Sequence, residues 1–192
     1  MNSRKGSLQK VIVLLAVASC CKAAAPLASS DEAAIQALLT ALPNLKSAAG
    51  SATDFCSLTN SRNLSISCSG PSTNPQRVRS LTINRAEGTL DGSVLAPLDN
   101  LTSLIIATSP GLTITNAGSW ANWTGLSLLT ISDAKLTEIP QAWTAAGVWP
   151  ALQQLIFSNN GLKSLPEGSP GAWPTLNQLS ITNNSGIQYI AG

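Results

Sequence analysis

Residues 152–162 read Leu-Gln-Gln-Leu-Ile-Phe-Ser-Asn-Asn-Gly-Leu, and the spacing of their apolar residues is the main indication of the fold. Side chains alternate between the two faces of an extended strand, so Leu155 and Phe157 point to one side and Ile156 to the other. Asn160 follows where the chain must turn, and its amide can satisfy backbone groups there. The segment predicts a short strand with one buried face and a turn held by an asparagine.

The same frame, with apolar residues at its first, fourth and sixth places, recurs in phase along the chain. No copy can bury its apolar stripe alone, so the copies must stack, with strands about 4.8 Å apart in a parallel ladder. The five copies are Val78-x-x-Leu81-x-Ile83, Leu101-x-x-Leu104-x-Ile106, Leu126-x-x-Leu129-x-Ile131, Leu152-x-x-Leu155-x-Phe157 and Leu176-x-x-Leu179-x-Ile181.

This frame resembles the leucine-rich repeat pattern over about 115 residues. The resemblance implies an α/β solenoid with short parallel strands on its concave face. Asparagine at the ninth place is present in only the last two copies, so we expect the first three turns to be less regular. The ninth place holds Ala86, Ser109, Ala134, Asn160 and Asn184.

Ahead of the repeats, an amphipathic helix is expected to cover the exposed end of the stack. Ser29-x-x-Glu32 has the form of a capping box. Pro43 should end the helix. Its apolar positions, at helical spacing on one face, are Ile35, Leu38, Leu39, Leu42 and Leu45.

Segment 1–25 has the layout of a cleaved secretory signal. Basic residues precede an apolar run at 11–18, and alanines follow at 23–25. The apolar run is too short for a membrane anchor, which needs about 20 residues. A bacterial lipoprotein box ending at Cys20 is the alternative interpretation. The expected organisation is a signal peptide at 1–25, a cap at 26–77 and about five repeats at 78–192, the last one incomplete.

Two cysteines remain in the body of the chain, Cys56 and Cys68. In an oxidising compartment they should form a disulfide that closes the cap, and two free thiols are the alternative. No further soft ligand accompanies them, so a metal site is not expected.

The cap also resembles the start of the leucine-rich surface antigens of kinetoplastid protozoa, the promastigote surface antigen type. The matching residues are Ala37-Leu38-Leu39-x-Ala41-Leu42-Pro43-x-Leu45, then Asp54-Phe55-Cys56-Ser57 and Cys68. The resemblance implies a secreted or cell-surface protein that acts in adhesion or host recognition. The chain departs from that family because it ends at Gly192 without a hydrophobic tail for a lipid anchor. A fragment of a plant-type extracellular receptor or inhibitor stays open as an alternative.

Composition excludes several classes of function. Only 10% of the residues are charged, and none is histidine, which rules out histidine-based catalysis and histidine metal ligands. Beyond the basic segment 1–25 the net charge is −2, which disfavours nucleic-acid binding. Asp133 and Glu138 could form a catalytic carboxylate pair, but their side chains should diverge. We therefore expect a protein without a cofactor or an enzymatic activity.

The outward side chains of the strands are small, polar and almost uncharged, and they form the default binding face of a curved solenoid. We expect an extracellular protein or glycan to bind there, with membrane association possible through an anchor outside this chain. A merely solvated sheet is the alternative. The candidate contact residues are Arg85, Thr130, Asp133, Gln154, Ile156 and Gln178.

Tryptophans follow the repeat as well. Trp123, Trp149 and Trp173 each lie three places before a repeat's first leucine, which favours a place in the core over a platform for sugars or membranes. Trp120 and Trp143 fall outside this register and are expected to be freer to be exposed.

Four triplets fit the acceptor pattern for N-linked glycosylation. Their asparagines are Asn63, Asn100, Asn122 and Asn183.

Overall fold

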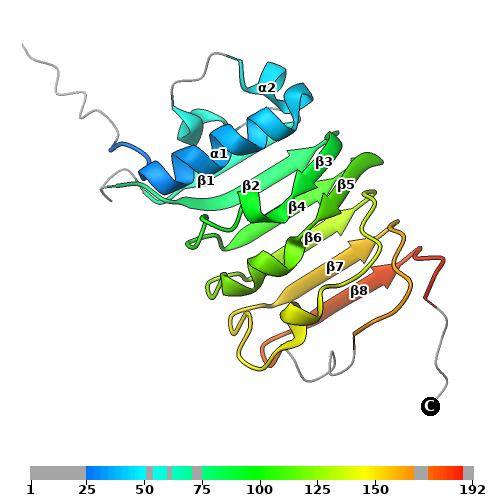
Figure 1. Cartoon of the computed structure of the whole chain (residues 1–192). Coiled ribbons are helices and arrows are strands. Elements are labelled where there is room, and N and C mark those ends of the chain that lie inside the picture. The colour runs from blue at the N-terminus through cyan, green and yellow to red at the C-terminus, as the bar shows by residue number, and fades with distance from the viewer. Residues whose placement is uncertain (1–24, 51–53, 60–61, 71–74, 167–172, 188–192) are drawn as a thin grey trace, which may run out of the picture.

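The computed structural model describes residues 25–50, 54–59, 62–70, 75–166 and 173–187. The expected signal peptide lies outside them, apart from its last residue. In Figure 1 the strands are stacked in the order of the chain, with two helices at the amino-terminal end. No helix in the described ranges has the length and apolar character needed to cross a bilayer.

The main sheet has six strands in the order β1-β2-β4-β6-β7-β8. Its first strand, β1, runs antiparallel to β2, and every later pair is parallel. Each parallel strand therefore comes from one copy of the repeat. The strands are β1 (Leu64–Cys68), β2 (Val78–Asn84), β4 (Ser103–Ala107), β6 (Leu128–Ser132), β7 (Gln154–Ser158) and β8 (Gln178–Thr182).

The strand register confirms the repeat frame. The fourth-place residues pair across the sheet in the order Leu81, Leu104, Leu129, Leu155, Leu179, and all but the last are fully buried. Leu179 is 50% exposed because β8 is the last described strand and has a neighbour on one side only. The sixth-place residues form the second row of the core side, Ile83, Ile106, Ile131, Phe157 and Ile181.

A second, smaller sheet pairs β3 (Glu87–Asp91) in parallel with β5 (Gly111–Thr115). These strands follow the turns of the first two repeats and pair residue by residue. The expectation that these turns would be irregular is therefore wrong. Ser109 replaces the ladder asparagine effectively: its hydroxyl accepts from the Ala86 N–H at 3.0 Å and donates to the Ala107 carbonyl at 2.8 Å. Once that turn is satisfied, the backbone beyond it can continue as a strand.

The cap contains α1 (Ser29–Ala41), α2 (Pro43–Ala49) and the 3-10 helix η1 (Phe55–Ser57). All five predicted apolar positions of the helical region are buried, and α1 ends before Pro43, which begins α2. The predicted disulfide between Cys56 and Cys68 is confirmed, with the Cα atoms 5.5 Å apart.

The predicted capping box at Ser29 is wrong. The residue before α1 is Ala28, and no side chain caps the helix. The Ala28 N–H donates to the Gln76 carbonyl at 2.8 Å, next to a bridge between Leu27 and Gln76. This pairing keeps the chain extended only through Ala28. Ser29 is therefore already helical, and the helix begins one residue earlier than a cap at Ser29 would imply.

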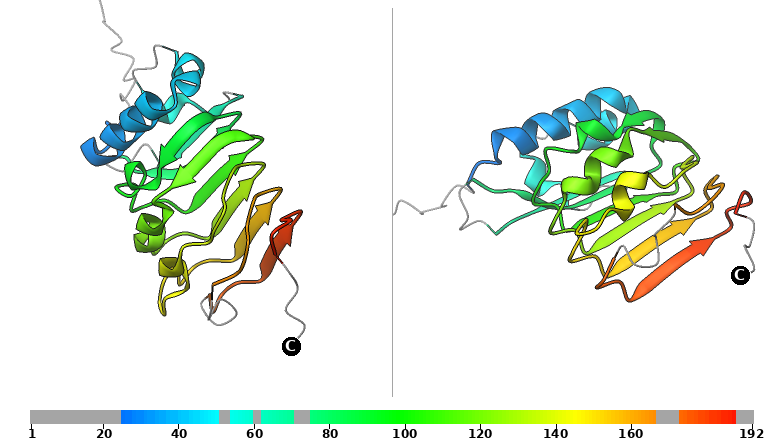
Figure 2. Two further views of the ribbon diagram at one scale, coloured as in Figure 1. Left: turned by 45° about the vertical axis from the view of Figure 1, so that its right-hand side comes forward. Right: turned by 60° about the horizontal axis from the view of Figure 1, so that its bottom comes forward.

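Three 3-10 helices, η2 (Gly92–Val94), η3 (Ala117–Asn122) and η4 (Gln141–Thr144), form a column along one side of the stacked strands (Figure 2). Their packing is close. A Cβ atom on Gly92 would lie 2.8 Å from the Ala117 Cα, so only glycine fits where η2 meets η3.

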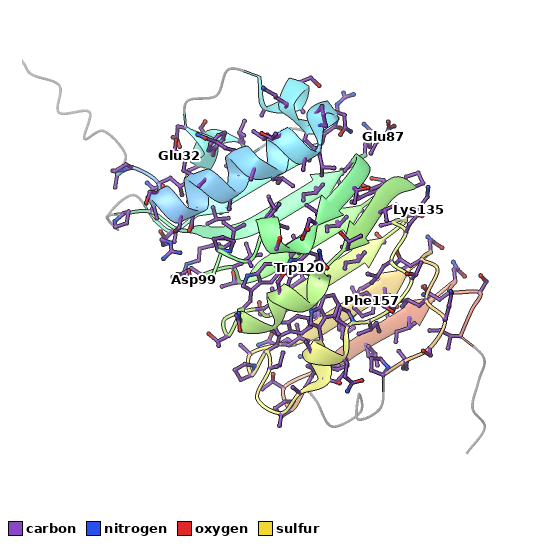
Figure 3. All side chains as sticks on the ribbon, viewed as in Figure 1. Glu32, Glu87, Asp99, Trp120, Lys135 and Phe157 are labelled. Carbon is purple, nitrogen blue, oxygen red and sulfur yellow. A yellow bond between two sulfur atoms is a disulfide. The ribbon has the colours of Figure 1, made fainter. Side chains whose placement is uncertain are left out.

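Tryptophans fill the space between these helices and the main sheet. Trp123 and Trp149 are fully buried and Trp173 is 6% exposed, as predicted. The expectation for Trp120 and Trp143 is wrong, because both are fully buried as well. Trp120 stacks on Trp123 with ring centroids 5.2 Å apart and on Trp143 at 5.6 Å. Figure 3 labels Trp120, which lies among the short helices, and Phe157, whose ring also stacks on Trp143.

The indole N–H groups explain why the two additional tryptophans are buried. Trp120 donates to the Gly92 carbonyl at 2.8 Å, and Trp143 donates to the Ala117 carbonyl at 2.9 Å. Each bond runs from one 3-10 helix to the first residue of the preceding one. Buried indoles normally find such a partner, and here the carbonyls at the starts of these helices provide it.

Candidate partner-binding face

The face of the main sheet that points away from the tryptophans carries the outward side chains of β2, β4, β6, β7 and β8. We call it the open face. The strand register sorts its side chains into three rows, all of them half-buried or exposed. The first row is Ser80, Ser103, Leu128, Gln154 and Gln178; the second is Thr82, Ile105, Thr130, Ile156 and Ser180; the third is Asn84, Ala107, Ser132, Ser158 and Thr182.

None of these side chains is ionisable. In Figure 3 the labelled charged residues Glu32, Glu87, Asp99 and Lys135 lie at the periphery of the stack. The open face therefore has no strong field to attract or orient a charged partner.

Three aliphatic side chains gather in the middle of the open face. Ile105 and Ile156 pair with Thr130 from either side, and Leu128 lies two places before Thr130 on the same strand. Ile105, Leu128 and Ile156 are all half-buried. We call these three residues the apolar centre. Hydroxyl and amide side chains surround it on the neighbouring strands.

A row of left-handed residues borders the open face where the strands end. The backbone φ angles lie between 47° and 54° at Arg85, Thr108, Asp133, Asn159 and Asn183. Three of their side chains are joined: the Asn183 amide donates to Asn159 at 2.8 Å, and the Asn159 amide donates to the Asp133 carboxylate at 2.9 Å. This border is thus partly fixed by contacts within the protein.

Beneath the border, the predicted role of the ninth-place asparagines is confirmed. The Asn160 amide donates to the Ile131 carbonyl at 2.8 Å, and its oxygen accepts from the Ala134 N–H at 3.3 Å. Asn184 repeats the pattern one copy later and donates to the Phe157 carbonyl at 3.0 Å. Each asparagine ties its own turn to the preceding one, which holds the strands of the open face in register.

The predicted contact residues divide between the face and its border. Thr130, Gln154, Ile156 and Gln178 lie together on the open face. Arg85 and Asp133 lie in the border row instead.

The two border residues differ in how accessible their side chains are to a partner. The Arg85 side chain is exposed, and its carbonyl accepts from the Asn44 amide of the cap. Asp133 is half-buried and already accepts from Asn159. The set of predicted contacts missed Ile105 and Leu128. The signal that could have found them is an aliphatic residue at an outward strand position.

The two carboxylates considered for catalysis do not share a site. Asp133 lines a hollow of about 410 Å³ together with Asn159 and Asn160. Glu138 lines a different hollow of about 480 Å³ beside β5. In the described ranges no cluster of three histidine, cysteine, aspartate or glutamate side chains is placed to hold a metal ion.

Two charged groups with shifted pKa values lie off the open face. The pKa of Arg77 is raised above its usual value, chiefly by its hydrogen bond to Asp31. The pKa of Asp91 is lowered from 3.8 because its carboxylate accepts from the hydroxyl and N–H of Ser93 and from Asn116. Both groups join neighbouring segments of the stack.

The predicted glycosylation sites are spread around the molecule. Asn63 immediately precedes β1, Asn100 lies between η2 and β4, and Asn122 is the last residue of η3. Asn183 lies in the border row of the open face.

Comparisons with known proteins give a similarity to a solved structure and no family. No family model and no curated protein matches the chain. Among solved structures, the chain is similar to the crystal structure of the LRR ectodomain of the receptor kinase SOBIR1 from Arabidopsis thaliana. The TM-score is 0.46 and the sequence identity 18%, over 84% of this chain and 96% of the other. The open face and its apolar centre are defined by the strand register of this chain alone.

Proposed function

We propose that this chain is an exported, non-catalytic leucine-rich repeat solenoid that binds a protein partner on its open face. The observation that carries the proposal is the apolar centre, Ile105, Leu128 and Ile156, set in an uncharged polar surround. Protein interfaces have the same anatomy, with a desolvated apolar middle and a polar rim. A solvated sheet would have no need of three aliphatic side chains grouped around Thr130.

The expected binding energy comes mainly from the apolar centre. Complete burial of one aliphatic side chain contributes about 1.5 to 3 kcal/mol. Because the three residues are already half-buried, a partner would gain only part of that from each. The surrounding serine, threonine and glutamine side chains can complete hydrogen bonds and so set the orientation of the partner.

A protein partner fits the open face better than a glycan does. Aromatic rings make large, rigid contact surfaces in binding sites, yet no aromatic side chain is among the residues of the open face. The tryptophans that could have provided such a platform are in the core. A glycan partner remains an outcome that the binding test below would detect.

Location outside the cytosol is part of the proposal. It is supported by the signal-like segment 1–25 and by the disulfide between Cys56 and Cys68. The proposed kinship with kinetoplastid surface antigens rests on residues of the cap, and a plant-type receptor or inhibitor ectodomain is the second candidate. In each case the open face would be the recognition surface.

Site-specific photo-crosslinking on the full chain tests the proposal. A photoreactive residue at Thr130, in the middle of the open face, should crosslink a protein, whereas one at the exposed Ala145 beyond η4 should not. The captured protein is then titrated against the unmodified chain. Crosslinks of equal yield at both positions, or release of the captured material by glycosidases alone, would contradict a protein partner on this face.

Variants then identify the contact. Leu128→Asp and Ile156→Asp should each weaken binding at least tenfold, about 1.4 kcal/mol, because a charge would be desolvated in the interface. Leu165→Asp is the matched control, since Leu165 is 43% exposed and lies outside the open face. The dissociation constant of the native chain should change little between about 50 mM and about 500 mM NaCl, as no charged group lies on the face. A steep salt dependence would place the contact on the charged border.

A further inference from the structure

We infer that Asn122 carries an N-linked glycan in the folded protein and that Asn183 does not. The inference rests on the proposed export, because the modification takes place in the secretory pathway. Sequence alone treats all four acceptor triplets alike. The structure separates them by the exposure of each triplet and by the hydrogen bonds of its side chains.

Asn122 is the acceptor that combines an exposed side chain with an amide and a triplet hydroxyl that make no hydrogen bond to a described residue. It is exposed at the end of η3, and its amide makes no hydrogen bond to another described residue. Thr124, which completes the triplet, is also exposed, and its hydroxyl is likewise free of described partners. Only the Thr124 backbone N–H is engaged, and it donates to the Asn122 carbonyl at 3.0 Å. A glycan can therefore leave Nδ2 without breaking a contact.

Asn183 has the opposite environment. Its Nδ2 donates to the Asn159 oxygen at 2.8 Å, and the Asn159 amide donates onward to Asp133. A glycan on this nitrogen would crowd the chain of hydrogen bonds and extend along the border of the open face. Asn184, in the middle of the triplet, donates to two carbonyls of the stack. Native packing at this turn therefore opposes the modification.

In the remaining two triplets the hydroxyl that completes the acceptor pattern donates a hydrogen bond to a backbone carbonyl. The Asn100 amide donates to Asp99 at 2.8 Å, and the Thr102 hydroxyl donates to the Arg79 carbonyl at 2.9 Å. Asn63 is half-buried, and the Ser65 hydroxyl that completes its triplet donates to the Thr59 carbonyl at 3.0 Å. Both sites are therefore less open to a glycan than Asn122, whose side chain and Thr124 hydroxyl are exposed and without described partners.

The position of Asn122 also suits the proposed function. The residue after it, Trp123, is fully buried in the layer between η3 and the main sheet. Asn122 thus belongs to the column of 3-10 helices in Figure 2, and the open face lies on the other side of the core. A glycan at Asn122 would leave the apolar centre accessible.

The modification is a group transfer from a lipid-diphosphate-linked oligosaccharide. The Asn122 Nδ2 forms a bond to the anomeric carbon of the sugar. The bond from that carbon to the diphosphate oxygen breaks, and the lipid diphosphate leaves. One amide proton is lost to the transferase, so Nδ2 keeps a single hydrogen.

The test is glycopeptide mapping of the full chain secreted from a eukaryotic host. Asn122→Gln should lower the intact mass by one glycan, and Asn183→Gln should leave the glycan mass unchanged. Thr124→Ala should reproduce the loss without altering the asparagine, whereas Thr124→Ser, which keeps the hydroxyl, should retain the glycan.

Each outcome bears on the inference. Secreted protein that is bare at Asn122, or that is modified at Asn183, would overturn it while leaving export and partner binding intact. Retention of the full chain in the cytosol would overturn export and the glycan together. Sugar at Asn122 with normal crosslinking through Thr130 would support both.

Discussion

Left-handed backbone at the strand ends is a residue-scale feature with an energetic cost. Asparagine tolerates positive φ comparatively well, and it occupies this position at 159 and 183. Thr108 has φ 47° in the equivalent turn, although β-branched residues rarely adopt this conformation. Its side chain is exposed and makes no hydrogen bond to a described residue. The strain at Thr108 is therefore not offset locally.

Replacing Thr108 by asparagine should stabilise the protein by about 1 kcal/mol, because the left-handed conformation costs a β-branched residue about that much more. Thermal and urea unfolding of the purified chain measure the change. Thr115→Asn is the matched control, since Thr115 is exposed at the end of β5 without positive φ. Equal effects of the two substitutions would show that backbone strain at Thr108 is not the cause.

At the scale of elements, the cap is fastened to the first repeat by one buried carboxylate. Asp31, in the first turn of α1, is fully buried. It accepts from the Val78 N–H at 2.7 Å and from the Arg77 guanidinium at 2.9 and 3.0 Å. Arg77 also pairs with Asp99, next to the loop that leads into β4. This cluster joins the helix, the first repeat strand and the following loop.

Asp31→Ala should lower the free energy of unfolding by about 3 kcal/mol or more, because it removes the partner of Arg77 and leaves the Val78 N–H unsatisfied. Glu32→Ala is the control in the same helical turn. Glu32 is exposed, and among the described residues its carboxylate accepts only from Gln36, at 3.2 Å. The control should therefore stay within about 0.5 kcal/mol of the native chain. Similar losses in the two variants, measured by chemical unfolding, would show that Asp31 is not what fastens the cap.

Over the whole molecule, stability is spread along the stack, because every repeat buries its apolar row against its neighbours. Leu155 is fully buried in the middle of this row, whereas Thr130, on the adjacent strand, points to the open face. The two positions therefore report on opposite sides of the same sheet.

Leu155→Asp should prevent stable folding, because it places an unpaired charge among aliphatic side chains. Thr130→Ala should change the free energy of unfolding by no more than about 0.5 kcal/mol. Circular dichroism and limited proteolysis distinguish these results. A protease-resistant Leu155→Asp protein, or a large loss of stability in Thr130→Ala, would contradict the register of the main sheet.

Much of this architecture could be predicted from the sequence. The apolar spacing places Leu81, Leu104, Leu129 and Leu155 in one buried row. Side chains alternate between the two faces of a strand, and a single repeat cannot shield its apolar side chains from water. The same alternation identifies Thr130, Gln154, Ile156 and Gln178 as surface residues. The apolar helix and the two cysteines of the cap were predictable too, since each depends on short-range spacing.

Other features depend on contacts between coils. Trp120 and Trp143 are buried because carbonyls of the preceding 3-10 helices accept from their indoles. The helix α1 begins at Ser29 because a distant segment, at Gln76, holds Ala28 extended.

The period, the buried rows and the cap could be read from the sequence, because these follow from local spacing and the need to exclude water from apolar side chains. The grouping of Ile105, Leu128 and Ile156 into one apolar centre depends on the stacking of the coils. So does the difference between the Asn183 amide, which is hydrogen-bonded, and the Asn122 amide, which has no partner among the described residues. Periodicity assigns a residue to a row, whereas its partners come from the neighbouring coil, a full repeat away in the chain.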